Sequence, residues 1–405
     1  MIIHSFHAYA VSKEQLPWKE FFWMKRCLCL WLALVLFAGT AWAAPLENDV
    51  PVELTSPSAM LLEAETGTVI FEKNADEKRQ VASITKLMTL LLCFEALGRG
   101  EIHLEDSVTI SPEAAGQIGS QALLDAGAVY PLETLLHATI IASANDAACA
   151  LAEHMAGSEA EFARLMNERA AELGMTSTFY VNATGLPDDR QYTTARDVAI
   201  LSCEMCRHPE YFTHASVWMD TLTHSSGRTT DLTNTNRLVR FYQGCDGLKT
   251  GSADASKYCL TATAQKGEMR LIAIVLGTPN SQTRFNEARA MLDYGFAGYK
   301  RVNVLQKGDL LGKSVAVKLG MQDTVEIAAG NGMSMLLKPG QEKLLSIEVE
   351  LPQEVPAPVS EGDELGIIRV KLSDSVIARL PAVAASDVDM PGLLAAFLKL
   401  FKNWR

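Results

Sequence analysis

The sequence lacks the histidine and cysteine patterns of metalloenzymes and disulfide-stabilised scaffolds. Eight histidines occur in 405 residues, yet none falls in a His-Glu-x-x-His motif, so we expect no catalytic metal and no other cofactor. The eight cysteines are scattered through apolar stretches, unlike a dense disulfide framework. Cys203 and Cys206 have redox or zinc spacing without a second cysteine pair, and we interpret them as buried or incidental thiols. A disulfide is the alternative in an exported chain.

An excess of positive charge is also absent. Lys and Arg number 36 against 48 Asp and Glu, which gives a net charge of -12. An acidic surface argues against nucleic acid as a partner. A local cationic site can still bind an anionic substrate against the global sign of the charge.

The amino-terminal region has no apolar run long enough for a comfortable membrane span. Met24-Lys25-Arg26 precedes an apolar run over residues 27–38, and Ala41-Trp42-Ala43 offers small residues at a cleavage site. We predict a signal peptide over residues 1–43, with Met24 as an alternative start, and therefore an exported, extracytoplasmic protein. An uncleaved membrane anchor is the alternative.

The residues from 44 to 298 have the pattern of one mixed domain. Alternating patterns and turn signals predict strands at 58–65, 68–72, 246–252, 258–264 and 270–277. Apolar periodicity predicts helices at 81–97, 132–142, 146–155 and 159–173. Because strands at both ends flank the helices, we predict an α/β (α+β) domain whose terminal strands join a single antiparallel sheet.

Two segments of different texture follow this domain. Short alternating apolar runs and recurrent glycine turns predict a small all-β domain over residues 299–384, which we interpret as a spacer or interaction module. Residues 385–405 end in a basic amphipathic pattern, which predicts a helix lying on a membrane surface. The alternative is a terminal helix that packs on its own protein. The apolar face of this helix consists of Leu393, Phe397, Leu400, Phe401 and Trp404.

Three short polar motifs occur in one order along the chain. They are Ser83-Ile84-Thr85-Lys86, Ser143-Ala144-Asn145 and Lys249-Thr250-Gly251. Each motif alone is common by chance, as a helical pair, a helix N-cap or a turn. Their order in an exported chain, within the expected helices and strand, favours a serine enzyme that transfers acyl groups.

The first two motifs supply a nucleophile and groups that move protons. On a helix, Ser83 and Lys86 lie on one face within reach of each other. A neutral amine can take the serine proton once burial and a nearby positive charge, for which Lys249 is the candidate, lower the amine pKa. We expect Ser143 to relay a proton to the leaving amine, and Asn145 to orient Lys86 or hold the substrate amide.

The third motif suits substrate binding. Lys249 and Thr250 fit recognition of a terminal carboxylate, and Gly251 lets a substrate backbone approach closely. If this strand lies at a sheet edge, it can pair with an extended peptide through main-chain hydrogen bonds. The backbone amides of Ser83 and Ser252 are then candidate oxyanion donors.

With these motifs the chain resembles the D-alanyl-D-alanine carboxypeptidases, the low-molecular-mass penicillin-binding proteins. The matching stretches are Ala82-Ser83-Ile84-Thr85-Lys86-Leu87-Met88-Thr89, Ser143-Ala144-Asn145-Asp146-Ala147-Ala148, Leu173-Gly174-Met175, Tyr192-Thr193-Thr194-Ala195, Asn234-Thr235-Asn236 and Asp246-Gly247-Leu248-Lys249-Thr250-Gly251. The resemblance implies a β-lactamase/transpeptidase-like domain, a β-rich second domain and often an amphipathic C-terminal anchor.

The resemblance also implies a reaction and a role for each motif residue. Ser83 would be the acyl nucleophile, Lys86 its base, and Ser143 and Asn145 the proton-transfer and positioning groups. Lys249 with Thr250 would bind the substrate carboxylate. The implied reaction removes the terminal D-Ala from peptidoglycan stem pentapeptides, and β-lactam antibiotics would acylate the nucleophile as substrate mimics.

The sequence departs from this family at two places, and other functions stay open. Ser252 stands where many relatives carry His or an aromatic residue, and Gln191 replaces a frequent His. A DD-endopeptidase or a β-lactamase-like hydrolase is the first alternative, although no convincing deacylation Glu follows the second motif. A non-enzymatic wall-binding protein is the second alternative, but it would require a broken catalytic set.

Overall fold

The computed structural model describes residues 53–392. The predicted signal peptide and residues 393–405 of the predicted C-terminal helix lie outside this range. Among the described residues, the helices are too short or too polar for any of them to span a bilayer.

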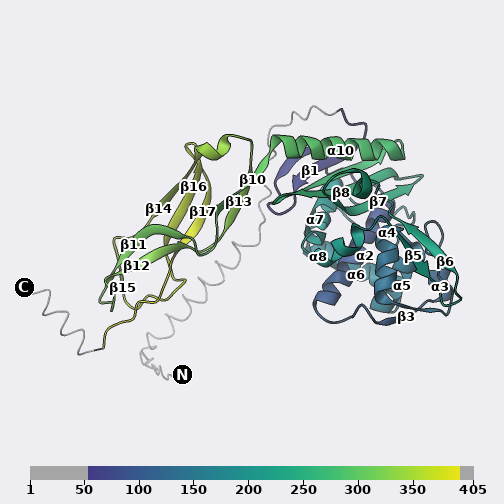
Figure 1. Cartoon of the computed structure of the whole chain (residues 1–405), viewed down its shortest axis with the longest axis horizontal. Helices are drawn as coiled ribbons and strands as arrows, with labels where there is room; N and C mark the ends of the chain where they lie inside the picture. The colour runs from purple at the N-terminus through teal and green to yellow at the C-terminus, as the bar shows by residue number, and fades with distance from the viewer. Residues whose placement is uncertain (1–52, 393–405) are drawn as a thin grey trace, which may run out of the picture. The chain divides into compact units, whose positions relative to one another are not determined.

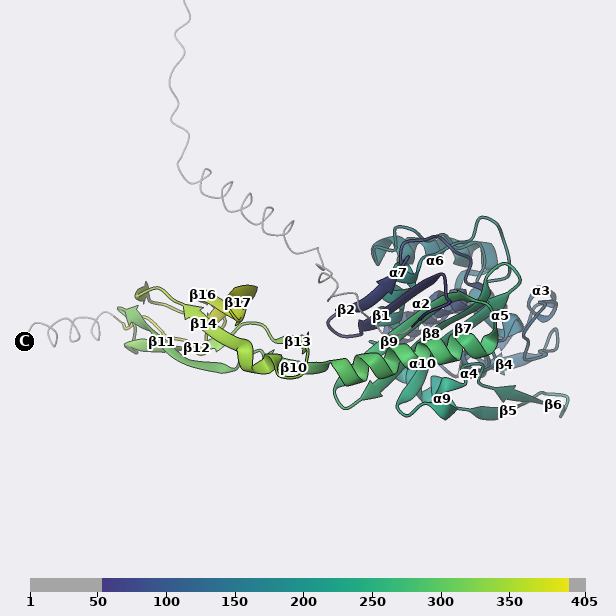
Figure 2. The same cartoon turned by 90° about the horizontal axis from the view of Figure 1, so that it is seen from above.

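The first domain, shown in Figure 1, is built on a five-stranded antiparallel sheet whose strand order is β2-β1-β9-β8-β7 (Figure 2). Its strands are β1 (Ser58–Glu63), β2 (Val69–Lys73), β7 (Cys245–Ala253), β8 (Lys257–Lys266) and β9 (Met269–Thr278). Strand β1 pairs with β9, placing Met60 opposite Ile274. The prediction that strands from the two ends of the domain share one antiparallel sheet is therefore confirmed. Strand β7, which carries the third motif, lies at the edge of the sheet.

Helices cover both faces of this sheet (Figure 2). Helix α10 (Ser281–Gly298) packs on one face, where its Phe285 and Met291 share a core with Leu61 and Leu271 of the sheet. A larger helical core lies on the other face. Burial on both faces explains why β8 and β9 each contain six consecutive buried residues instead of an alternating pattern.

The larger core is formed mainly by helices between β2 and β7. These are α2 (Lys86–Gly98), α4 (Leu132–Ile141), α5 (Asn145–Ala156), α6 (Glu159–Glu172), α7 (Ala195–Met205) and α8 (Pro209–Ala215), with short helices α3 (Pro112–Ala115) and α9 (Leu238–Phe241). Two small hairpins accompany them, β3 (Ser107–Thr109) with β4 (Val129–Pro131) and β5 (Met219–Thr223) with β6 (Thr229–Thr233). Most predicted helix bounds agree with these within one residue.

The prediction of one helix over residues 81–97 is wrong in its first turn. Residues Ala82–Thr85 form a separate 3₁₀ turn, η1, and the α-helix begins only at Lys86. Ala82 has a positive φ of 47°, which no α-helix contains. The apolar periodicity could not show this break because a 3₁₀ turn and an α-helical turn have nearly the same side-chain spacing.

The residues after α10 form β structure, as the all-β prediction required. Strands β10 (Lys300–Leu305) and β13 (Met333–Leu337) pair with each other. A six-stranded sheet follows the order β14-β16-β17-β12-β11-β15, beside the short turn η2 (Gln341–Leu344). Its strands are β11 (Leu310–Lys318), β12 (Thr324–Ala329), β14 (Leu345–Glu350), β15 (Glu354–Pro356), β16 (Glu364–Leu372) and β17 (Ser375–Ala384). A core of its own, with Ile327 and Ile368 fully buried, supports this module.

The six cysteines in residues 53–392 are free thiols. Four of them are buried. Cys203 and Cys206 at the end of α7, interpreted above as buried or incidental thiols, are half-buried. The described structure has no disulfide bond between Cys203 and Cys206, which was the alternative interpretation.

Candidate active site

Ser83 lies in the 3₁₀ turn that precedes α2. The chain reaches this turn after Arg79 bridges to Thr193, and the positive φ of Ala82 redirects the backbone just before the serine. Ser83 is half-buried. The next turn then begins the long helix and places Lys86 three residues later.

Lys86 is fully buried and lies at the centre of the site. Its Nζ is 3.0 Å from Ser83 Oγ and donates to the Thr184 carbonyl at 2.5 Å. It also donates to Asn145 Oδ1. The predicted contact between Ser83 and Lys86 is therefore present, and the same amine joins the first motif to the second.

The second motif lies where α4 ends and α5 begins. Ser143 has a positive φ of 59°, and Asn145 is the first residue of α5. Asn145 Nδ2 donates to the Ile118 carbonyl at 2.5 Å, which fixes the amide so that its oxygen faces Lys86. Ser143 Oγ is buried and makes no hydrogen bond within the described residues, so its proton has no competing protein acceptor there.

The third motif lies on edge strand β7. Lys249 is buried, and its Nζ donates to the Thr250 carbonyl at 3.4 Å. Thr250 Oγ1 donates to Thr235 Oγ1 at 2.8 Å, and Arg284 Nη1 donates to the Gly251 carbonyl at 3.0 Å. Ser252 is exposed at the same edge.

Two glycines let the backbone segments of the site approach closely. A Cβ on Gly251 would lie 2.1 Å from the Val81 carbonyl oxygen. A Cβ on Gly185, which has a φ of 79°, would lie 2.1 Å from the Ala82 carbonyl oxygen. Real Cβ atoms do not come so close, so strand β7 and the 185 loop can flank the serine turn only with glycine at these positions. The three motifs, far apart in the sequence, therefore converge on one site.

Comparison with known proteins identifies the family of this site. A family model described as D-alanyl-D-alanine carboxypeptidase matches residues 44–280, and a model described as the C-terminal domain of penicillin-binding protein 5 matches residues 299–390. The chain belongs to the D-alanyl-D-alanine carboxypeptidase family. It is a serine-type D-Ala-D-Ala carboxypeptidase of the penicillin-binding class, as the resemblance implied.

Individual relatives of the carboxypeptidase extend over most of its length. The D-alanyl-D-alanine carboxypeptidase DacF of Bacillus subtilis is 36% identical over 94% of this chain and 99% of its own. DacC of Escherichia coli is 34% identical over 92% of this chain and 95% of its own. Penicillin-binding protein 5 from Haemophilus influenzae has a TM-score of 0.75 at 29% identity, over 84% of this chain and 100% of its own.

The two lysines of the carboxypeptidase have lowered pKa values. Burial is the main cause at Lys86, and the positive charge of Lys249 lowers the pKa of Lys86 further, against the opposing charges of Asp146 and Glu159. Burial, together with the charge of Arg284, lowers the pKa of Lys249 to about 7. Lys249 therefore acts on Lys86 as a positive charge only while it is itself protonated.

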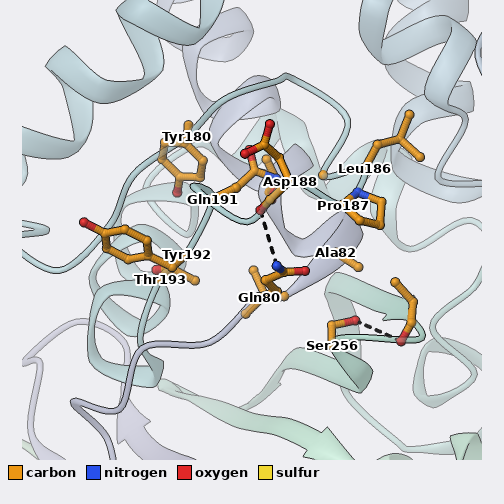
Figure 3. Close-up of a pocket in the computed structure, with 14 residues that line it drawn as sticks. Gln80, Ala82, Tyr180, Leu186, Pro187, Asp188, Gln191, Tyr192, Thr193 and Ser256 are labelled. Carbon is orange, nitrogen blue, oxygen red and sulfur yellow. Dashed lines mark hydrogen bonds between the residues drawn. The ribbon is translucent and has the colours of Figure 1, made fainter.

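A small hollow of the carboxypeptidase lies beside the serine turn (Figure 3). Its walls include Ala82, Leu186, Tyr192 and Ser256, which come from η1, the 185–193 loop and the turn after β7. Gln191 supports this loop, because its Oε1 accepts hydrogen bonds from the backbone of Val181 and Asn182. Gln191 is thus a structural amide in this loop.

Sequence reasoning missed three contributors to the site. They are the Thr184 carbonyl on Lys86, Arg284 on the Gly251 carbonyl, and the hydroxyl of Thr235 on Thr250. A backbone carbonyl has no sequence signature, and Arg284 comes from helix α10 without a local motif. The sequence did point to Thr235, because the Asn234-Thr235-Asn236 stretch is one of those that resemble the family. Without that resemblance, nothing in the stretch indicates a functional residue.

Proposed function

We propose that this carboxypeptidase removes the terminal D-Ala from peptidoglycan stem pentapeptides through an acyl-enzyme on Ser83. The carrying observation is the environment of Lys86, whose buried amine contacts Ser83 Oγ and two further oxygens. This environment supports a role as the base that activates the serine.

The hydrogen bonds of Lys86 favour that role once the amine is neutral. A neutral primary amine has two N–H donors and one lone pair. The Asn145 Oδ1 and Thr184 carbonyl oxygens can only accept, so they take the two N–H groups. In this neutral form the lone pair is left for Ser83, whose Oγ lies 3.0 Å away, and the serine hydroxyl becomes the donor. Burial and the charge of Lys249 lower the pKa of Lys86, which raises the share of the amine that is neutral.

The acylation step follows from this arrangement. Ser83 Oγ attacks the carbonyl carbon of the penultimate D-Ala while its proton passes to Lys86 Nζ. The backbone amides of Ser83 and Ser252 are the proposed donors to the oxyanion that forms. Because β7 is an edge strand, its free main-chain groups can pair with the substrate and hold the carbonyl in place.

Collapse of the tetrahedral intermediate releases D-alanine. The C–N bond breaks, and the leaving nitrogen takes a proton that Lys86 passes through Ser143. Ser143 Oγ suits a relay because it is buried without another hydrogen-bond partner in the described structure. Water then attacks the ester with Lys86 again as base, which returns Ser83 to its starting state.

Lys249 and Thr250 are the proposed partners of the substrate's terminal carboxylate. One supplies a positive charge and the other a hydroxyl donor at the strand edge. The same groups and the same nucleophile would bind and react with β-lactam antibiotics. This is supported by penicillin-binding protein D2 of Listeria monocytogenes, solved in the ampicillin-bound form, which has a TM-score of 0.52 at 32% identity over 61% of this chain and 100% of its own.

We further propose that the enzyme acts outside the cytoplasm, on the outer face of the cytoplasmic membrane. The apolar run and small-residue site before Ala44 support export, and the basic amphipathic pattern of the last residues supports peripheral membrane attachment. The mature chain should sediment with anionic vesicles, whereas a chain ending at Met390 should stay in the supernatant. Equal sedimentation of the two would contradict the attachment.

The test of the reaction is release of free D-alanine from a D-Ala-D-Ala-terminated pentapeptide. Wild type should release it, and Ser83→Ala and Lys86→Ala should each lose at least about 10³-fold in turnover. Ser226→Ala is the matched control, because Ser226 is exposed on the β5–β6 turn. Turnover by Ser83→Ala at the wild-type rate would refute the proposal, and cleavage of cross-linked peptides alone would favour an endopeptidase.

A further inference from the structure

A threonine on the loop after β6 contacts the third motif from outside it. Thr235 Oγ1 accepts a hydrogen bond from Thr250 Oγ1 at 2.8 Å. The backbone N–H of Thr235 donates to the Ile141 carbonyl at 3.1 Å, two residues before Ser143. Thr235 is therefore attached both to the strand that carries Lys249 and to the segment that leads into the second motif.

Two buried asparagines hold Thr235 in this position. Asn234 Nδ2 donates to the carbonyls of Ala215 and Val217 at 2.9 and 2.8 Å. Asn236 Nδ2 donates to the Gly247 carbonyl at 2.8 Å, at the start of β7. Both amides are thus occupied by the protein, whereas Thr235 is half-buried between them. Of the three side chains in the Asn234-Thr235-Asn236 stretch, that of Thr235 is the one that is not buried.

We propose that Thr235 is a further substrate-binding residue, whose hydroxyl binds the terminal carboxylate of the substrate together with Thr250. This inference rests on the proposed function. A carboxylate only accepts hydrogen bonds, and it has two oxygens to satisfy. The third motif by itself supplies a single hydroxyl. The Thr235 hydroxyl, 2.8 Å from that of Thr250, supplies the second donor beside it.

The hydrogen bonding of the free enzyme leaves these protons available. Thr250 directs its proton to Thr235, and Thr235 donates its own side-chain proton to no group among the interactions that the structure describes. A hydroxyl proton rotates about its C–O bond, so both protons can turn to the carboxylate when it enters. These hydrogen bonds are charge-assisted because the carboxylate that accepts them is ionised. The buried amine of Lys249 lies on the same strand and attracts the carboxylate when it is protonated.

The proposal predicts a specific defect in recognition of the carboxylate. A C-terminal carboxamide has one accepting oxygen and no charge, and its NH2 group donates hydrogen bonds. Two hydroxyl donors therefore match a carboxylate better than a carboxamide. Thr235 should therefore contribute to the choice of carboxylate over carboxamide, and not only to overall activity. A role limited to holding β7 in place would affect both kinds of substrate equally.

The test compares two peptides that end in D-Ala-D-Ala and differ only in a terminal carboxylate or carboxamide. Thr235→Val keeps the shape of the side chain and removes the hydroxyl. It should lower kcat/KM for the carboxylate peptide by about tenfold or more and for the carboxamide by less than about twofold. Thr235→Ser should restore the ratio. Thr233→Val is the matched control on neighbouring β6, where the side chain is exposed.

The outcomes separate this inference from the proposed function. An equal loss on both peptides, or no loss on either, would overturn the role of Thr235. Failure of the wild type to release any product would overturn the proposed function instead. In that case two acylation rates are compared, one with benzylpenicillin and one with its methyl ester, which lacks the free carboxylate. If the ratio of these rates is the same in Thr235→Val as in the wild type, the inference is again overturned.

Discussion

Lys86 and Lys249 are two amines buried in one site, and burial determines the properties of both. Spacing in the sequence predicted that Lys86 would reach Ser83, and the 3.0 Å contact confirms it. Chemical reasoning, not spacing, named Lys249 as the candidate positive charge that lowers the pKa of Lys86, and Lys249 does lower it, after burial. The Thr184 carbonyl that completes the environment of Lys86 was not predictable, because its place depends on how a distant loop folds back onto α2.

The burial of Lys249 predicts a pH-dependent cost to stability. Its pKa is about 7 in the folded protein, against about 10.4 for an unperturbed lysine in the unfolded chain. Between these values the unfolded state binds more protons, so the free energy of unfolding rises with pH. Below about pH 7 both states are protonated at this residue, and the cost of burying the charge is fully present.

Lys249→Met should therefore be more stable than wild type at pH 6.5, with an advantage that shrinks toward pH 10. The variant should meanwhile lose most of its activity on D-Ala-D-Ala peptides. Thermal unfolding of both proteins across this pH range checks the prediction, since groups common to both cancel in the difference. An advantage that grows with rising pH would contradict it.

At the scale of elements, the site depends on close contact between η1, the 185 loop and strand β7. Residue patterns predicted the strand and its place among the terminal strands of the sheet. They did not predict the 3₁₀ turn at Ala82–Thr85, because it begins at a positive φ of Ala82, a conformation that no residue pattern marks for alanine. The close approach of Gly251 to Val81 explains why a glycine follows Lys249 and Thr250.

Gly251→Ala should separate β7 from η1. The added Cβ would meet the Val81 carbonyl at 2.1 Å, and backbone on both sides cannot yield as a flexible side chain would. We expect at least about a hundredfold loss of kcat/KM and a lower melting temperature. Gly98→Ala is the control, because Gly98 ends α2 with open space around its Cβ position and should tolerate the change. Full activity in Gly251→Ala would show that the contact is not required.

At the scale of the whole molecule, the sequence predicted the class of the fold better than its connections. Turn signals and alternating runs predicted the β structure after residue 299, but not the strand order β14-β16-β17-β12-β11-β15. Strand order depends on which apolar faces meet in the folded state, as Ile327 and Ile368 do in one core. Likewise, no spacing rule shows that residues 83, 143 and 249 meet in one site. That expectation came from the order of the three motifs and from their resemblance to the family.

The convergence of three distant motifs on one nucleophile is tested most directly by locating the penicillin adduct. The mature protein is treated with benzylpenicillin, digested, and the modified peptide is sequenced by mass spectrometry. One equivalent should be attached to Ser83, with no adduct in Ser83→Ala and markedly slower acylation in Lys86→Ala and Lys249→Met. A stoichiometric adduct on any other residue of the folded wild type, or none at all, would contradict the account.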